Sequence, residues 1–129
     1  MYLIDTSILI HLMGGHPKAR SRLDSLTQLT PAYTSVIAEG ELLAGIYRLP
    51  ADARERELQM ARVVLGRLKI LPVNSSLADR YGRVRAYLKP RSRNDAWIAA
   101  TALEHGLILV TDDADFGRVP DLIVENWVR

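Results

Sequence analysis

The chain has 129 residues, the size of one domain, and its 48% apolar and 25% charged residues are typical of a folded globular protein rather than a disordered one. The absence of cysteine excludes disulfides and cysteine-ligated zinc or iron–sulfur sites. The formal net charge of +2 is too small to indicate a nucleic-acid partner by itself. No signal-peptide pattern opens the chain, and no apolar run approaches the roughly 20 residues that span a bilayer. We therefore expect one domain over residues 1–129, located in the cytoplasm and not in a membrane.

Short aliphatic and β-branched runs alternate along the chain with longer segments of helical periodicity. The pattern predicts strands at residues 2–4, 32–34, 70–73, 107–110 and 122–124. It predicts helices at residues 7–13, 17–29, 36–47, 53–68, 75–88 and 95–105, with Asn94 as the N-cap of the last and Gly106 ending it. Strands separated by helices pair in parallel through right-handed crossovers. The expected fold is therefore α/β, a three-layer α/β/α arrangement with a central parallel sheet of four to five strands.

Acidic residues fall where the predicted strands end and where the following helices begin. They are Asp5, Glu39, Glu41, Asp95, Asp112, Asp113 and Asp115. In open parallel sheets the functional crevice lies beyond the carboxyl ends of the strands, so at least four of these acids are expected to meet at one edge. Carboxylates brought together repel one another, and a hard cation such as Mg²⁺ or Mn²⁺ relieves that repulsion. The pattern predicts a metal site at this edge.

Each acid also has a simpler interpretation. Asp5 could cap the helix that follows it, Asp95 could interact with the dipole of its own helix, and the acids after residue 111 could be turn residues. Helical projection places Glu39 and Glu41 near the edges of the apolar face and does not choose between them. The joint placement of the acids at one edge favours a functional site over these separate explanations.

Six basic residues and no acid lie between residues 80 and 93. They are Arg80, Arg83, Arg85, Lys89, Arg91 and Arg93. Such a stretch suits the phosphates of a nucleic acid, and it also suits a solvated helix face.

Four segments carry a recognisable combination of motifs: MYLIDTS at 1–7, ELLAG at 41–45, NDAWIAA at 94–100 and LVTDDADF at 109–116. Their order and spacing, over the whole chain, resemble those of PIN-domain ribonucleases, and in particular the VapC-type toxins of type II toxin–antitoxin pairs. The resemblance implies an endoribonuclease that uses Mg²⁺ or Mn²⁺ and a metal-activated water to hydrolyse RNA phosphodiesters, leaving a 5′-phosphate and a 3′-hydroxyl. It also implies a cognate antitoxin as partner and a homodimer.

The resemblance assigns roles to individual residues. The catalytic acids would be Asp5, Glu41, Asp95 and Asp113, and the metal would be held by Asp5, Asp95 and Asp113. Supporting roles would fall to Thr6, Thr111 and Asp115, with Asp115 the alternative to Asp113 as the fourth acid. The basic residues between 80 and 93 would contact RNA phosphates outside the catalytic centre.

Two other functions fit parts of the pattern. One is a catalytically silent RNA-binding or interaction module on the same fold. The other is an aspartyl-phosphate phosphatase or receiver domain in which Asp5 is the nucleophile. Such a phosphatase places a second aspartate where this chain has Ser7, and a receiver needs a lysine where it has Asp112 and Asp113.

Overall fold

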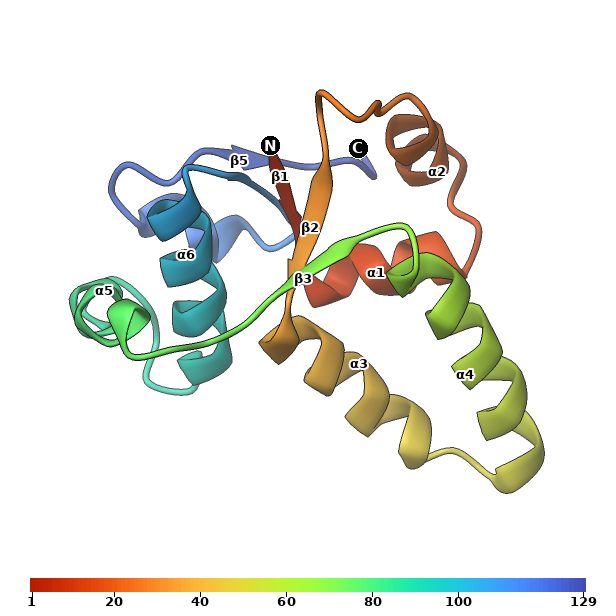
Figure 1. Ribbon diagram of the computed structural model, residues 1–129. Helices are drawn as coiled ribbons and strands as arrows, with labels where there is room; N and C mark the ends of the chain where they lie inside the picture. Colours follow the sequence, from red (N-terminus) through yellow and green to blue (C-terminus); the bar gives the residue numbers. More distant parts are fainter.

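The computed structural model describes residues 1–129 and contains one five-stranded sheet (Figure 1). The strands are β1 (Tyr2–Ile4), β2 (Ala32–Ser35), β3 (Lys69–Leu71), β4 (Ile108–Val110) and β5 (Val124–Glu125). All neighbours pair in parallel, in the order β3-β2-β1-β4-β5. The predicted α/β class and parallel sheet are confirmed, and β3, which ends just before Pro72, is the edge strand that this proline indicated.

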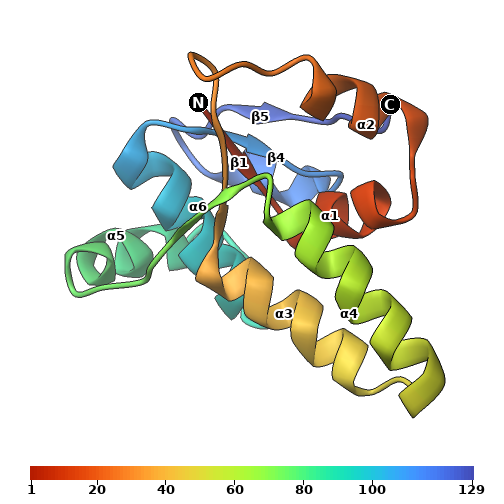
Figure 2. The same cartoon turned by 45° about the vertical axis from the view of Figure 1, so that its right-hand side comes forward.

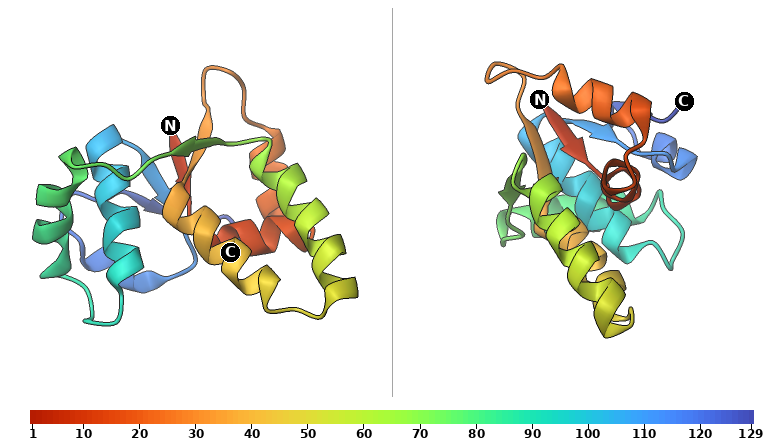
Figure 3. Two further views of the ribbon diagram at one scale, coloured as in Figure 1. Left: turned by 60° about the horizontal axis from the view of Figure 1, so that its bottom comes forward. Right: turned by 90° about the vertical axis from the view of Figure 1, so that its right-hand side faces the viewer.

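Six α-helices and one short 3₁₀ helix surround the sheet. They are α1 (Thr6–Met13), α2 (Pro17–Asp24), α3 (Val36–Tyr47), α4 (Ala51–Leu65), α5 (Ser76–Arg85), α6 (Arg93–His105) and η1 (Ala114–Arg118). Helices α5 and α6 lie on one side of the sheet, and α1 to α4 lie on the other (Figure 3). None of the helices is both long enough and apolar enough to span a membrane.

Helix α2 ends five residues earlier than the sequence predicts. The predicted segment reached Leu29, but the chain turns after Asp24. The amide of Thr27 donates to the Thr30 hydroxyl at 3.0 Å, and the amide of Leu29 donates to the Thr27 hydroxyl at 3.1 Å. Threonine side chains thus replace the backbone bonds that a further helical turn would make.

Several other predicted boundaries were wrong by a few residues, whereas β1 at residues 2–4 and α3 at residues 36–47 match the predicted ranges. Helix α4 begins at Ala51, directly after Pro50, and ends before Gly66, and α5 ends at Arg85. The last strand is residues 124–125 rather than 122–124. The predicted N-cap of α6 was also wrong: Ser92 occupies that position, since its carbonyl accepts from the Ala96 amide at 3.1 Å. Asn94 is therefore inside the first turn of α6.

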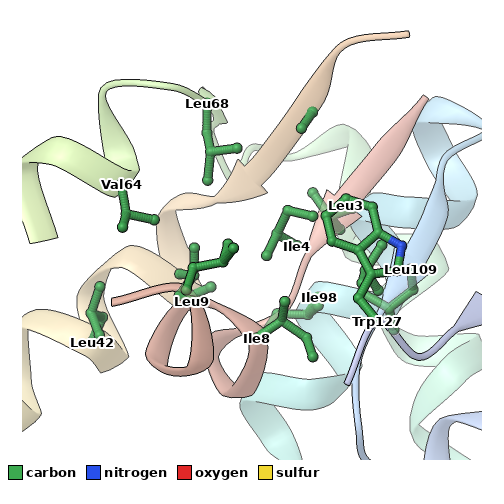
Figure 4. Packing of buried hydrophobic residues seen from close by; sticks show 14 of the residues in the cluster. Leu3, Ile4, Ile8, Leu9, Leu42, Val64, Leu68, Ile98, Leu109 and Trp127 are labelled. Carbon is green, nitrogen blue, oxygen red and sulfur yellow. The ribbon is translucent and has the colours of Figure 1, made fainter. Parts of the chain in front are cut away.

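The core is formed by the two central strands and the helices on both sides of them (Figure 4). Leu3 and Ile4 of β1 and Leu109 of β4 are fully buried. Ile8 of α1 covers one face and Ile98 of α6 the other, and both are fully buried. A buried aliphatic side chain of this size contributes about 1.5–3 kcal/mol. The centre of the sheet is therefore a rigid support for whatever lies at its carboxyl edge.

The strand order reverses between β1 and β4, and we call the edge beyond Ile4 and Val110, at the carboxyl ends of these two strands, the crevice. From β1 the chain leads through α1 and α2 to β2 on one side, whereas β4 lies on the other side (Figure 2). The loops after two such neighbouring strands diverge, and ligands bind in the space that this leaves. Asp5 directly follows β1, and Thr111 directly follows β4.

Candidate metal centre

Asp5 lies at this edge, directly after β1, and is only 6% exposed. Its Oδ1 accepts a hydrogen bond from the Thr6 amide at 2.8 Å, which makes it the N-cap of α1. Its Oδ2 accepts from the Thr111 hydroxyl at 2.7 Å and, more weakly, from Ser7 Oγ at 3.5 Å. The capping interpretation is therefore confirmed, and it is compatible with the site interpretation because the cap uses one carboxylate oxygen and leaves the other to Thr111.

Burial raises the pKa of Asp5 from 3.8 to about 6. The hydrogen bonds from Thr111 and Thr6 oppose this rise, and the negative charges of Asp95 and Glu41 add to it. Acids from three distant parts of the sequence therefore act on one another here. At neutral pH the centre has a concentration of negative charge that the protein itself only partly compensates.

Glu41, from α3, is held by both of its carboxylate oxygens. Thr6 Oγ1 donates to Oε1 at 2.8 Å, and Asn94 Nδ2 donates to Oε2 at 3.2 Å. Glu39 makes no side-chain hydrogen bond or ion pair and is half-buried elsewhere on the same helix. The structure thus selects Glu41 as the acid of this helix that faces the crevice.

Asp95 lies in the first turn of α6 and is half-buried. Its pKa is raised by burial first, and then by the nearby charges of Asp113, Glu41 and Asp115, with a hydrogen bond from Ser92 opposing. Asp95 therefore lies between the acids of α3 and those that follow β4.

Thr111 connects the segment after β4 to Asp5. It is almost fully buried, and while its hydroxyl donates to Asp5 it accepts from the Asp113 amide at 3.1 Å. Asp113 Oδ1 in turn accepts from the Asp115 amide at 2.9 Å and so caps η1. Asp112 contacts His11 Nε2 at 3.2 Å instead.

Asp115 has a cationic partner. Lys89 Nζ lies 3.3 Å from its Oδ2, and Arg118 is 3.9 Å from Oδ1. Asp113 makes no ion pair, so its charge stays available to the centre, and this difference favours Asp113 over Asp115 as the fourth acid.

The donor set suits a hard divalent cation. The carboxylates of Asp5, Glu41, Asp95 and Asp113 carry oxygen donors. Burial raises the pKa values of Asp5 and Asp95 first, and repulsion from the neighbouring acids, which a cation relieves, raises them further. As the side chains stand, no three acidic or histidine side chains converge closely enough to form a coordination shell. Binding of a cation therefore requires the acidic side chains to move closer together.

Several residues of the site escaped sequence reasoning. Ser7 bridges the two sides of the crevice, since its hydroxyl also accepts, at 3.5 Å, from the Asp112 amide. Asn94, predicted to cap α6, instead holds Glu41, and Lys89, predicted to contact phosphates, instead pairs with Asp115. The only sequence feature that could have indicated Ser7 and Asn94 is their adjacency to the Asp5–Thr6 and Asp95 motifs.

The basic stretch between residues 80 and 93 is largely paired within the protein. Arg80 meets Glu104 at 2.9 Å, Arg83 meets Asp79 at 3.0 Å, and Lys89 meets Asp115. Arg85 donates to the carbonyls of Lys89 and Pro90, each at 3.2 Å. Only Arg91 and Arg93 remain exposed and without a carboxylate partner, and both precede Asp95 closely.

The family model described as PIN domain matches residues 2–122. The chain therefore belongs to the PIN domain family. Within it, the chain is similar to VapC-type ribonucleases. It is 32% identical to Ribonuclease VapC2 of Haemophilus influenzae, with 98% of each chain covered. It is 30% identical to Toxin FitB of Neisseria gonorrhoeae, covering 98% of this chain and 97% of that one.

A solved structure agrees with these relatives. VapBC2 from Rickettsia felis, bound to a DNA fragment from its promoter, matches with a TM-score of 0.86 at 28% identity, covering 98% of each chain. The resemblance on which the residue assignments rest is confirmed at the level of the family.

Proposed function

We propose that this chain is the toxin of a toxin–antitoxin pair and cleaves RNA phosphodiesters by hydrolysis that depends on Mg²⁺ or Mn²⁺. The observation that carries the proposal is the position of Asp5, a buried carboxylate where the strand order reverses between β1 and β4. Its pKa is raised to about 6, mainly by burial, and the charges of Asp95 and Glu41 contribute to the rise. Burying such a charge costs stability, and a binding site for a cation explains why it is there.

The residues divide into acids that hold the cation and groups that orient those acids. In this proposal Asp5, Asp95 and Asp113 would hold the cation, and Asp115 would support them. A bound divalent ion would lower the pKa of the attacking water and stabilise the negative charge that develops on the phosphate.

Thr111, Thr6 and Glu41 orient the acids or accept a proton. Thr111 keeps Asp5 ionised and directed by donating to Oδ2, and Thr6 fixes Glu41 through Oε1. Glu41 would be the acid that accepts a proton from water, since the hydrogen bonds from Thr6 and Asn94 hold its carboxylate in one orientation and its side chain is only half-buried.

The partners follow from the relatives. VapBC-1 from nontypeable Haemophilus influenzae is a second match, with a TM-score of 0.82, 28% identity and coverage of 99% of this chain and 98% of that chain. Because the VapBC structures are toxin–antitoxin systems of relatives covered almost from end to end, we propose an antitoxin partner for this chain. We also propose that the chain forms a homodimer and that residues 1–129 are one domain. Its proposed location is the cytoplasm, where RNA is available.

The test is cleavage of total cellular RNA by the purified protein, with the ends of the products sequenced. The expected result is cleavage that requires Mg²⁺ or Mn²⁺, leaves 5′-phosphates and disappears in Asp5→Asn. Cleavage that persists in chelator, or products with 2′,3′-cyclic ends, contradicts the proposal. No cleavage by the parent under any cation, with RNA still bound, favours the silent module instead.

A further inference from the structure

A cavity of about 510 Å³ lies between the start of α2 and the segment that follows β5. We call it the α2–β5 cleft, and its charged walls are Lys18, Arg22, Glu125 and Arg129. A smaller hollow of about 220 Å³ lies next to it, beyond the end of β4, and its walls include Thr111 and Asp113. The two cavities share Asn126 and Arg129. The cleft is therefore continuous with the segment that supplies the fourth acid of the centre.

The cations of the cleft are only partly neutralised by the protein. Arg22 meets Glu125 at 2.8 Å and lies over the ring of Trp127, with its guanidinium carbon 5.4 Å from the ring centre. Lys18 and Arg129 are exposed and have no carboxylate within ion-pair distance. The cleft thus has two cationic side chains without a side-chain carboxylate partner, Lys18 and Arg129, and a third, Arg22, that Glu125 fixes in position.

Most of the residues that line the cleft have charged or polar side chains. Only one of its eight lining residues is hydrophobic. Trp127 is 3% exposed, packs edge-on against Tyr2 and donates its indole N–H to Glu125 at 3.3 Å. Its ring is therefore not free to stack on a base, and what the cleft offers is cationic and hydrogen-bonding groups for an anionic backbone.

We propose that the α2–β5 cleft binds the phosphate groups of the substrate RNA on one side of the cleaved bond. This inference rests on the proposed function. The acidic centre cannot hold the neighbouring phosphates, because its own charge repels them, so cations must lie on the path of the strand to either side. Arg91 and Arg93 lie before Asp95 on the α6 side, and Lys18 and Arg129 lie beyond Asp113 on the β5 side. Recognition through phosphates predicts binding without base preference in the cleft.

The test compares two variants with the same reduction of charge. Lys18→Gln/Arg129→Gln empties the cleft of its free cations, and Arg56→Gln/Arg62→Gln removes two exposed cations of α4 that make no ion pair. Each pair is placed in the parent for cleavage kinetics, and in an Asp5→Asn background for binding of a short fluorescein-labelled single-stranded RNA, measured by anisotropy over a series of salt concentrations.

The cleft pair is expected to weaken RNA binding roughly three- to thirtyfold and to raise KM rather than lower kcat, with the α4 pair close to the parent. A plot of log affinity against log salt concentration has a negative slope, and this slope is expected to become shallower by about 0.7 for each phosphate that the variant no longer neutralises. Equal affinities and equal slopes for the two pairs overturn the inference. Cleavage by the parent is read separately: if the parent does not cleave RNA at all, the proposed function fails, whatever the two pairs do to binding.

Discussion

Replacing Asp5 by asparagine is expected to stabilise the protein at neutral pH while abolishing its activity. In the folded chain the Asp5 pKa is about 6, against 3.8 for an unperturbed aspartate. Two pKa units correspond to about 3 kcal/mol that the folded state loses when Asp5 ionises. Asparagine keeps the shape and can still cap α1, but it carries no charge, so most of this cost is removed.

The pH dependence of the stability difference shows whether the ionised Asp5 carboxylate is its cause. Between about pH 4 and 6 the folded parent binds the Asp5 proton and the unfolded chain does not, so the contribution of Asp5 to stability falls as the pH rises through this window. Near pH 4 and below, Asp5 is protonated in the folded state, and the parent and variant are expected to be similar. Above pH 6.5 the variant is expected to be more stable than the parent by about 1–3 kcal/mol. The gain can be smaller than the full amount of about 3 kcal/mol because asparagine loses part of the Thr111 hydrogen bond.

The measurement is urea denaturation of parent and variant in chelator, at pH 4.5 and at pH 7.5. The expected result is a higher midpoint for Asp5→Asn at pH 7.5 and a difference that shrinks at pH 4.5. A variant less stable than the parent at pH 7.5, or a difference independent of pH, would refute the argument that the buried charge of Asp5 is a cost.

Three further predictions concern the groups around Asp5. Thr111→Val removes a donor that lowers the Asp5 pKa, so the Asp5 carboxyl is expected to titrate above pH 6 by NMR, with a loss of about 1–3 kcal/mol in unfolding free energy. Asn94→Ala frees Oε2 of Glu41 and is expected to reduce the cleavage rate about tenfold, while the melting temperature stays within a few degrees of the parent; an unchanged rate refutes the role of Asn94. Glu41→Gln and Asp95→Asn are each expected to abolish cation-dependent cleavage in chains that still fold by circular dichroism, and Asp95→Asn also to lower the Asp5 pKa.

The fold could be predicted from sequence because its determinants are local. The runs at β1 and β4 are short and fully apolar, the helices between strands have clear periodicity, and the Asp5 and Thr111 positions follow strand ends directly. The rule that parallel sheets form their crevice at the carboxyl edge then places the acids together without any knowledge of side-chain contacts.

What the sequence did not predict depends on pairs of residues far apart in the chain. Arg80 and Lys89 belong to a basic stretch, yet Glu104 and Asp115 come from later elements and take up their charges. The sequence favours Asn94 as a helix cap because caps are local, whereas its partner Glu41 lies 53 residues earlier. The early end of α2 has a different cause, since apolar periodicity does not report side-chain competition for the backbone of the kind that Thr27 and Thr30 provide.

The proposed chemistry requires that Asp5, Asp95 and Asp113 form one cation site. Titration of the protein with Mn²⁺, followed by electron paramagnetic resonance of the free ion, measures this directly. Saturable binding to the parent that is strongly weakened in each of Asp5→Asn and Asp95→Asn is the predicted result. Equal Mn²⁺ uptake by the parent and both variants, or none by the parent, contradicts it.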